Sequence, residues 1–261
     1  AGMTTIIGSG GSKGAPPGSR SPKTTPDSLD SRQYATVLDL ISEGEIEGLV
    51  DGNNSIFLNG TALENAQGEF NFEDVTVYTR NGTQAQTYIP ITSGTENERS
   101  VNRPVTQSVS VTETITDDDV DAVRVTVTIP SLQRIINENG DTLGASVQLK
   151  IFAQYGGGGF GDALIDDTIS GRTADLYQKD YLITLNRPNA TDNVDIKVER
   201  VTEDSNDALL TNSFTWSSMT EIKYAKLRYP NSALVALRVD AEQFSSIPTR
   251  KYLVKGIKVR I

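Results

Sequence analysis

The 261-residue sequence contains neither histidine nor cysteine. Without histidine, the chain lacks the commonest general base, every Ser-His-Asp triad and the commonest zinc ligand. Without cysteine, it has no thiol nucleophile, no Cys-based zinc or iron–sulfur site and no disulfide. Any metal would need oxygen ligands, which favours calcium or magnesium. We predict no cofactor and no enzymatic activity.

Long apolar runs and positive charge are also scarce. No apolar run approaches the roughly 20 residues that a membrane-spanning helix needs. The formal net charge is −10, and its distribution is uneven, because residues 1–26 contain Lys13, Arg20 and Lys23 but no acid. The remaining residues therefore carry −13. A body this acidic repels the phosphates of nucleic acids, which disfavours nucleic-acid binding as the main role.

Residues 1–30 are rich in Gly, Ser, Pro, Thr and Lys. Such a segment cannot bury enough apolar surface to fold alone. Two interpretations stay open, a disordered tail and an arm that becomes ordered only against a neighbouring subunit. We treat 1–30 as an extended N-terminal arm.

From Tyr34 onward the pattern is typical of antiparallel β-sheet. Apolar and polar residues alternate in many short segments separated by polar turns, which favours a mainly β fold of about eight to twelve strands. SIFLNGTAL (55–63) contains an Asn59-Gly60 turn, a strong hairpin signal. The alternating segments are 75–79, 105–116, 120–130, 146–155, 181–185, 194–201, 233–240 and 251–261. One or two helical turns are expected, for instance at 131–138.

The stretch ISEGEIEGLVDG (41–52) combines several carboxylates with three glycines. One hypothesis is catalytic, with Glu45 or Glu47 acting as in glycosidases. On a strand, however, Glu43, Glu45 and Glu47 share one face about 7 Å apart, which makes a row and not two walls of a cleft. A strand-turn-strand with its bends at the glycines is the favoured interpretation.

Two acidic segments are candidate cation sites. Asp117, Asp119 and Asp121 are spaced like half of a calcium loop, but the sixth-position glycine and the distal glutamate are missing. NENGD (137–141) offers similar oxygen ligands around an Asn-Gly turn. Strand-connecting turns are the simpler interpretation of both. The alternative is a calcium-assisted carbohydrate-binding β-sandwich that uses the aspartates of 117–121.

Two further features have a structural and a functional interpretation. GGGGFG (156–161) fits a nucleotide-binding glycine pattern, but no helix-forming sequence follows it and nearby aspartates would repel phosphate. We therefore expect a flexible hairpin loop. Trp216 is the single tryptophan, and it can anchor either the protein core or an interface.

Several stretches together resemble the N-terminal part of the host specificity protein J family, the tail-tip attachment (central hub) proteins of lambda-like long-tailed phages. The resemblance covers most of the chain in order, with 156–212 matching more loosely, and the last stretch is the longest and most specific. The stretches are LISEGEIEGLVDG (40–52), SIFLNGTAL (55–63), TVYTRNGTQAQTYIP (76–90), ITDDDVDAVRVTVTIPSL (115–132), SFTWSSMTEI (213–222) and AKLRYPNSALVALRVDAEQFSSIPTRKYLVKGIKVRI (225–261).

The resemblance implies a homotrimeric hub in the virion tail tip, assembled in the host cytoplasm. Its implied partners are the distal tail protein ring, other tail-tip proteins and the tape measure protein, with DNA passing through without specific binding. No membrane contact is expected of this segment. Family members are considerably longer, which fits the apolar run at the end, and we expect the natural chain to continue past Ile261.

On this basis we expect an antiparallel β-sandwich, residues 64–209, inserted into a β-rich hub domain. The two halves of the hub domain are 31–63 and 210–261. Predicted interface residues lie in the strand-turn-strand and near the end of the sequence; they are Ile41, Gly44, Ile46, Gly48, Trp216, Tyr229, Pro230 and Phe244.

Overall fold

The computed structural model describes residues 22–29, 34–91, 93–136, 138 and 140–258. These residues form nineteen strands and two short 3-10 helices. The mainly β prediction is confirmed, whereas the expected number of strands was too low. The two helices, Gly52–Ser55 and Ala241–Gln243, are single turns, and none of the described helices could cross a membrane.

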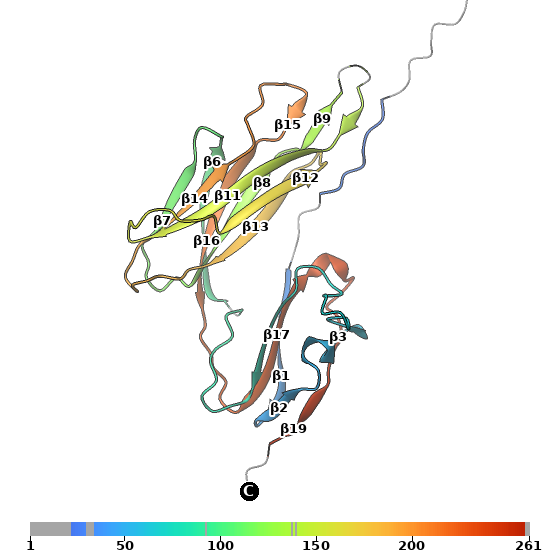
Figure 1. Cartoon of the computed structure of the whole chain (residues 1–261), viewed down its shortest axis with the longest axis vertical. Helices are drawn as coiled ribbons and strands as arrows, with labels where there is room; N and C mark the ends of the chain where they lie inside the picture. The colour runs from blue at the N-terminus through green and yellow to red at the C-terminus, as the bar shows by residue number, and fades with distance from the viewer. Residues whose placement is uncertain (1–21, 30–33, 92, 137, 139, 259–261) are drawn as a thin grey trace, which may run out of the picture.

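Two four-stranded antiparallel sheets form a sandwich, the upper part of the molecule in Figure 1. One sheet has the order β12 (Ile165–Gly171), β11 (Ala145–Tyr155), β14 (Val194–Arg200) and β7 (Val111–Ile115). The other has the order β13 (Tyr177–Thr184), β8 (Ala122–Ile129), β16 (Phe214–Tyr224) and β6 (Ser93–Val105).

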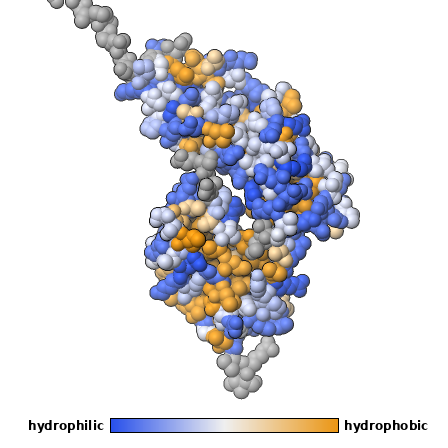
Figure 2. Space-filling view, turned by 180° about the vertical axis from the view of Figure 1, so that it is seen from behind, coloured by the Kyte–Doolittle hydropathy of each residue, from blue (hydrophilic) through white to orange (hydrophobic). Residues whose placement is uncertain are grey.

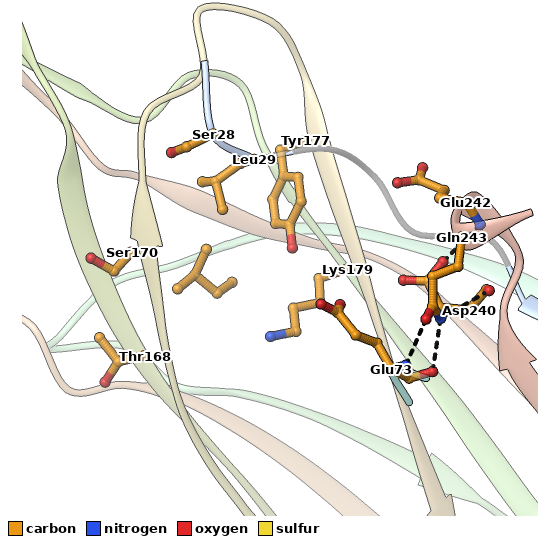
Figure 3. A pocket seen from close by; sticks show the side chains of 11 residues that line it. Ser28, Leu29, Glu73, Thr168, Ser170, Tyr177, Lys179, Asp240, Glu242 and Gln243 are labelled. Atoms are coloured by element: carbon orange, nitrogen blue, oxygen red, sulfur yellow. Dashed lines mark hydrogen bonds between the residues drawn. The ribbon is translucent and has the colours of Figure 1, made fainter. Parts of the chain in front are cut away.

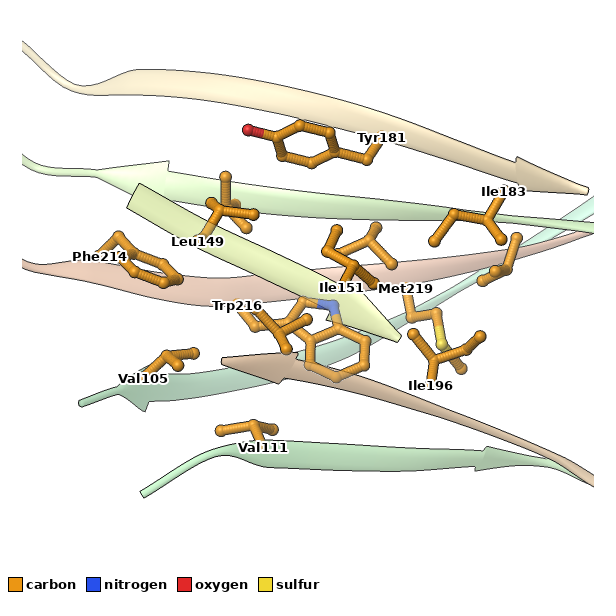
Figure 4. Packing of buried hydrophobic residues seen from close by; sticks show 14 of the residues in the cluster. Val105, Val111, Leu149, Ile151, Tyr181, Ile183, Ile196, Phe214, Trp216 and Met219 are labelled. Carbon is orange, nitrogen blue, oxygen red and sulfur yellow. The ribbon is translucent and has the colours of Figure 1, made fainter. Parts of the chain in front are cut away.

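The alternation of the sequence explains how the sandwich closes. Successive side chains of a strand point to opposite faces, and β14 alternates between buried and half-buried positions along its whole length. The buried side chains of both sheets form one core, with Trp216 fully buried in it (Figure 4). A bulge at Ser217 shifts the register of β16 against both neighbours, and the Trp216 Nε1–H donates to the Ser218 carbonyl at 2.8 Å.

A small sheet extends one end of the sandwich, in the order β10 (Thr142–Leu143), β9 (Gln133–Ile135) and β15 (Leu210–Thr211). Residues 22–29 lie along this end as a strap. The Thr25 N–H donates to the Thr142 carbonyl at 2.9 Å, and the Ser28 N–H donates to the Arg172 carbonyl at 2.8 Å. This part of the predicted arm is therefore ordered against its own sandwich, while residues 1–21 and 30 lie outside the described residues.

Three smaller antiparallel sheets make up the lower body in Figure 1. The first has the order β1 (Tyr34–Glu43), β17 (Ser232–Asp240) and β5 (Thr76–Asn81). The second has the order β18 (Arg250–Tyr252), β3 (Ile56–Leu58) and β4 (Thr61–Ala62). The third pairs β19 (Val254–Ile257) with β2 (Ile46–Leu49).

The lower body has a core divided by β17. Val235, Leu237 and Val239 face the β3–β4 side, whereas Leu234 and Ala236 face Ile89 on the other side. Both faces of β17 are thus covered, which explains its nearly continuous burial. Between β3 and β4, Asn59 and Gly60 have φ of 48° and 85°, which confirms the predicted hairpin turn.

Several predicted elements differ from the structure. The run 105–116 is broken at residues 106–110 between β6 and β7, and 251–261 is split between β18 and β19, with 259–261 outside the described residues. Residues 131–138 contain strand β9 and no helical turn in their described part, because β9 finds partners in β10 and β15. Of the NENGD turn, Asn137 and Asn139 also lie outside the described residues.

The strands cross both expected boundaries of the insertion. Strand β5 follows residue 64 in the chain, yet it pairs with β17 of the lower body. Strand β16 follows residue 209, yet it lies between β8 and β6 of the sandwich. Pairing partners distant in sequence decided these memberships, and local alternation carries no information about them.

Candidate functional site

The sandwich and the lower body meet across an open cleft. Among the described residues no sheet contains strands of both parts. The cleft between them measures about 880 Å³, and its walls carry Tyr34, Tyr78 and Arg238 from the lower body and Arg124 and Tyr224 from the sandwich. The Arg238 guanidinium lies 3.9 Å from the centre of the Tyr34 ring. The two parts are therefore held by their connections more than by a packed interface.

A second, smaller hollow of about 380 Å³ lies where the strap reaches the lower body (Figure 3). Leu29 and Tyr177 line it from the strap and the sandwich. On the other side, the Glu73 N–H donates to the amide oxygen of Gln243 at 2.8 Å. The amide nitrogen of Gln243 donates to the Glu73 carbonyl at 3.1 Å. The Lys179 ammonium is paired with Asp167 at 2.7 Å. Because these polar groups are bonded within the chain, the hollow has the character of a junction and not of a ligand site.

Two connectors on the other side of the molecule are tied together by Gln86. Its side chain is 7% exposed. Its amide nitrogen donates toward the carbonyl oxygens of Arg228 (3.0 Å), Tyr229 (2.7 Å) and Ser232 (2.9 Å). Its amide oxygen accepts from the Gly82 N–H at 2.9 Å. No sequence motif marked Gln86, since a single glutamine in a loop carries no periodic or spacing signal.

The lower body leaves many apolar side chains exposed. Figure 2 shows hydrophobic residues gathered on the lower body, whereas the sandwich is mainly hydrophilic on the same face of the molecule. Leu40 on β1 and Val254 on β19 line an open groove of about 600 Å³. We call the exposed apolar residues on and beside β1, β2 and β19 the apolar edge; they are Leu40, Val50, Leu253, Val254 and Ile257.

An ion pair beside the apolar edge joins β1 to β18, an early and a late strand of the lower body. The Arg250 guanidinium donates to the Asp39 carboxylate from Nε at 2.5 Å and from Nη2 at 3.0 Å, and the Tyr252 hydroxyl donates at 2.6 Å. The hydrogen bond from Arg250 lowers the pKa of Asp39 against the opposing effect of burial, and the hydrogen bond from Tyr252 adds to it. This network fixes β18 against β1, and it escaped the sequence analysis because its partners are 211 positions apart.

The candidate calcium ligands do not form one site. Asp117 and Asp119 lie close together with Asp118 in the turn between β7 and β8, as expected for a strand-connecting turn. The Lys223 ammonium lies 2.7 Å from Asp117 and 3.7 Å from Asp119. Its hydrogen bond with Asp117 lowers the pKa of that aspartate. A cation of the chain itself thus pairs with two of the three carboxylates of the cluster.

Asp121 serves a different purpose from Asp117 and Asp119. It accepts the Tyr224 N–H at 2.9 Å and pairs with Lys226 at 3.0 Å. It therefore pins the end of β16 where the chain leaves the sandwich.

The three glutamates of the ISEGEIEGLVDG stretch do not form a row on one strand. Glu43 ends β1, Glu47 lies on β2, and Glu45 lies between the strands, where it pairs with Lys258 at 2.8 Å. Gly44, with φ of 104°, is where the chain passes from one sheet to another. The predicted strand-turn-strand is confirmed with its bend at Gly44, whereas Gly48 lies inside β2 and makes no bend.

The glycine-rich segment is the loop between β11 and β12, which pair as an antiparallel hairpin. The Lys197 ammonium lies 4.2 Å from the centre of the Phe160 ring and 4.5 Å from that of Phe152. Phe160 therefore holds the loop over the sheet by cation–π contacts, and no helix follows that could present N–H groups to a phosphate.

The predicted interface residues have very different positions. Trp216 belongs to the sandwich core, so it cannot contact another subunit in this fold, and the core interpretation holds for it. Ile46 and Gly48 are buried, Ile41 and Phe244 pack against the lower core, and Phe244 stacks on Phe72 at 5.4 Å. Gly44 is half-buried. Only Tyr229 and Pro230 are exposed, and both lie on the connector that Gln86 binds.

Comparisons with known proteins point to one family. Residues 95–225, which include both sandwich sheets, match a family model described as "Tip attachment protein J, FNIII-A domain". The chain is 35% identical to Tip attachment protein J of Escherichia phage SECphi4 over 265 residues, covering 99% of this chain and 23% of that protein. It is 31% identical to the protein of the same name from Escherichia phage SECphi27, covering 90% of this chain and 19% of that protein. The chain thus spans less than a quarter of the length of these relatives.

Similarity to solved structures is weak. A structure titled "CBM4 structure and function" is 10% identical, covers 71% of this chain and 97% of its own, and has a TM-score of 0.23. A VP2 protein of infectious bursal disease virus is 9% identical, covers 88% of this chain and 61% of its own, and has a TM-score of 0.21. These scores are too low to support an argument about fold or function.

Proposed function

The chain belongs to the tip attachment protein J family, and we propose that it forms part of the trimeric central hub of a long-tailed phage tail tip. In this role it is a structural component of the virion and not an enzyme. The observation that carries the proposal is the identity of 35% along nearly the whole chain to a tip attachment protein.

The lower body is the hub domain of this proposal. Its described strands come from residues 34–81 and 232–257, and the sandwich, residues 93–224, is inserted between them. The apolar edge supports the assignment, because the contacts between subunits of a ring need apolar surface that a monomer would leave in water. Leu40 is 59% exposed and Ile257 is 60% exposed, and contact with a neighbouring copy would remove both from solvent.

The proposed partners are the distal tail protein ring, other tail-tip proteins and the tape measure protein. The acidic body supports a wall along which DNA passes without binding, since its carboxylates repel phosphates. Under this proposal the three-fold ring closes or lines the DNA path, and a signal from the receptor-binding part of the longer protein loosens it.

The test is the native mass of the chain over a range of concentrations, alone and with the distal tail ring. We expect a species of three 28.2 kDa copies that joins the ring. Leu40→Asp together with Ile257→Asp should leave the chain monomeric, because a charge in an apolar interface stays desolvated and unpaired. Leu176→Asp is the matched control, since Leu176 is 60% exposed on the sandwich. A chain that stays monomeric at every concentration and ignores the ring contradicts the proposal.

A further inference from the structure

The two connectors bound by Gln86 link the sandwich with the lower body. One, residues 82–91, leads from β5 toward β6, and the other, residues 225–231, leads from β16 to β17. Gln86 belongs to the first connector, and its amide group reaches across to two carbonyl oxygens of the second, those of Arg228 and Tyr229, and to the carbonyl oxygen of Ser232 at the start of β17. The side chain thereby joins two segments that are about 140 positions apart in sequence. We call this set of hydrogen bonds the Gln86 clamp.

The second connector has an unfavourable backbone. Lys226, Tyr229 and Asn231 have φ of 51°, 45° and 59°. Asparagine tolerates this left-handed region, but lysine and tyrosine are rarely found there, because Cβ approaches the following carbonyl oxygen. Two such residues within four positions persist only when their surroundings impose the conformation.

Contacts at both ends of the connector impose it. At the sandwich end, Asp121 accepts the Tyr224 N–H and pairs with the Lys226 ammonium at 3.0 Å. At the lower end, the Ser232 N–H donates to the Tyr229 carbonyl at 3.1 Å, and the same carbonyl accepts from Gln86 at 2.7 Å. The clamp therefore acts on the strained residue Tyr229 itself.

Apart from the strap 22–29, which is hydrogen-bonded to the sandwich and precedes β1 in the chain, few packed contacts fix the angle between the two parts. The sheets of the described residues do not cross between them, and the cleft that separates them is open and about 880 Å³ in volume. Parts joined in this way move relative to each other unless a large apolar interface prevents it. We propose that the Gln86 clamp and the strained connector 225–231 form a hinge that is held in one conformation, and that losing the clamp releases the strain and lets the sandwich swing relative to the lower body.

The experiment measures distances between spin labels in the full chain, which suits labelling because it has no native cysteine. One label replaces Thr112 on the sandwich and one replaces Thr61 on the lower body, both exposed. A second pair, at Thr112 and Ser146, stays within the sandwich and reports whether it remains folded. In the unmodified background we expect a narrow distribution for both pairs.

Gln86→Ala should broaden the distribution between the two parts at least twofold and leave the pair within the sandwich unchanged. Gln84→Ala is the matched control, because Gln84 is exposed on the same connector. This variant should leave the distance distributions of both label pairs unchanged. Gln86→Glu keeps the size of the side chain but cannot donate to the three carbonyls, so it should broaden the distribution as Gln86→Ala does.

The proposal would be overturned if the distance distribution between the two parts had the same width in Gln86→Ala as in Gln84→Ala. Broadening by Gln86→Ala without broadening by Gln86→Glu would also overturn it, since the cause would then be lost volume and not lost hydrogen bonds. The inference concerns the single chain, so it stands or falls independently of hub assembly.

Discussion

The sandwich has a single core between its two sheets, whereas the core of the lower body is divided in two by β17. Twenty-three buried residues form one continuous core in the sandwich. In the described part of the lower body, two buried apolar clusters of six and three residues lie on opposite faces of β17. The sandwich therefore has the core of an independent domain, while the lower body depends more on specific polar and backbone contacts.

The largest expected effect tests the core of the sandwich. Trp216→Ala should lower the free energy of unfolding of the sandwich by about 3–5 kcal/mol, because it removes a fully buried indole and leaves a cavity. Hydrogen exchange followed peptide by peptide should show the loss in β8 and β16 and spare β1 and β17. Leu176→Ala, at an exposed site of the sandwich, is the control and should change protection little. Equal loss in both parts would show that they unfold as one unit.

The next effect tests close backbone contact in the lower body. A Cβ at Gly82 would lie 2.7 Å from the Gly44 carbonyl oxygen and 3.1 Å from the Ala233 nitrogen. Gly82→Ala should therefore destabilise the lower body by about 3 kcal/mol, part from the clash and part from its positive φ. Gly52→Ala measures the cost of the positive φ alone, because Gly52 also has positive φ but has open space around it. This variant should lower the free energy of unfolding by about 1 kcal/mol. Chemical denaturation of the two variants measures the difference, and equal losses would contradict the close approach.

A smaller effect tests the ion pair that closes the lower body. The pKa of Asp39 is lowered from 3.8 in the folded state, so its carboxylate contributes stability that is fully present above 3.8 and is lost as the pH falls through the lower pKa of the folded state. Asp39→Asn should lower the free energy of unfolding by about 2 kcal/mol near pH 7. Against the unmodified chain, the difference should shrink progressively as the pH falls below about 4. Denaturation curves at several pH values measure it, and a difference independent of pH would exclude the charge as the cause.

The smallest expected effect concerns calcium. Because Lys223 already pairs with Asp117 and Asp119, millimolar calcium should shift the melting temperature of the chain by less than about 1 °C. A clear rise in melting temperature together with glycan binding would favour the carbohydrate-binding alternative over the hub. Differential scanning calorimetry with calcium and with magnesium measures the shift, and a glycan array with calcium measures the binding.

The sequence by itself determined the β class, the Asn59-Gly60 turn, the bend at Gly44 and the family. These features depend on local alternation, on turn residues and on the order of characteristic stretches, all of which are visible along the chain. It also identified Trp216 as an anchor without deciding between core and interface.

Only the tertiary structure decided which distant segments meet. It placed β5 and β16 across the expected boundaries, brought Lys223 to the aspartate turn, and paired Asp39 with Arg250. It also gave Gln86 its buried position between two connectors. The physical reason is that a buried hydrogen bond or ion pair depends on the partner that the fold supplies, and single polar residues in loops carry no periodicity that would reveal that partner.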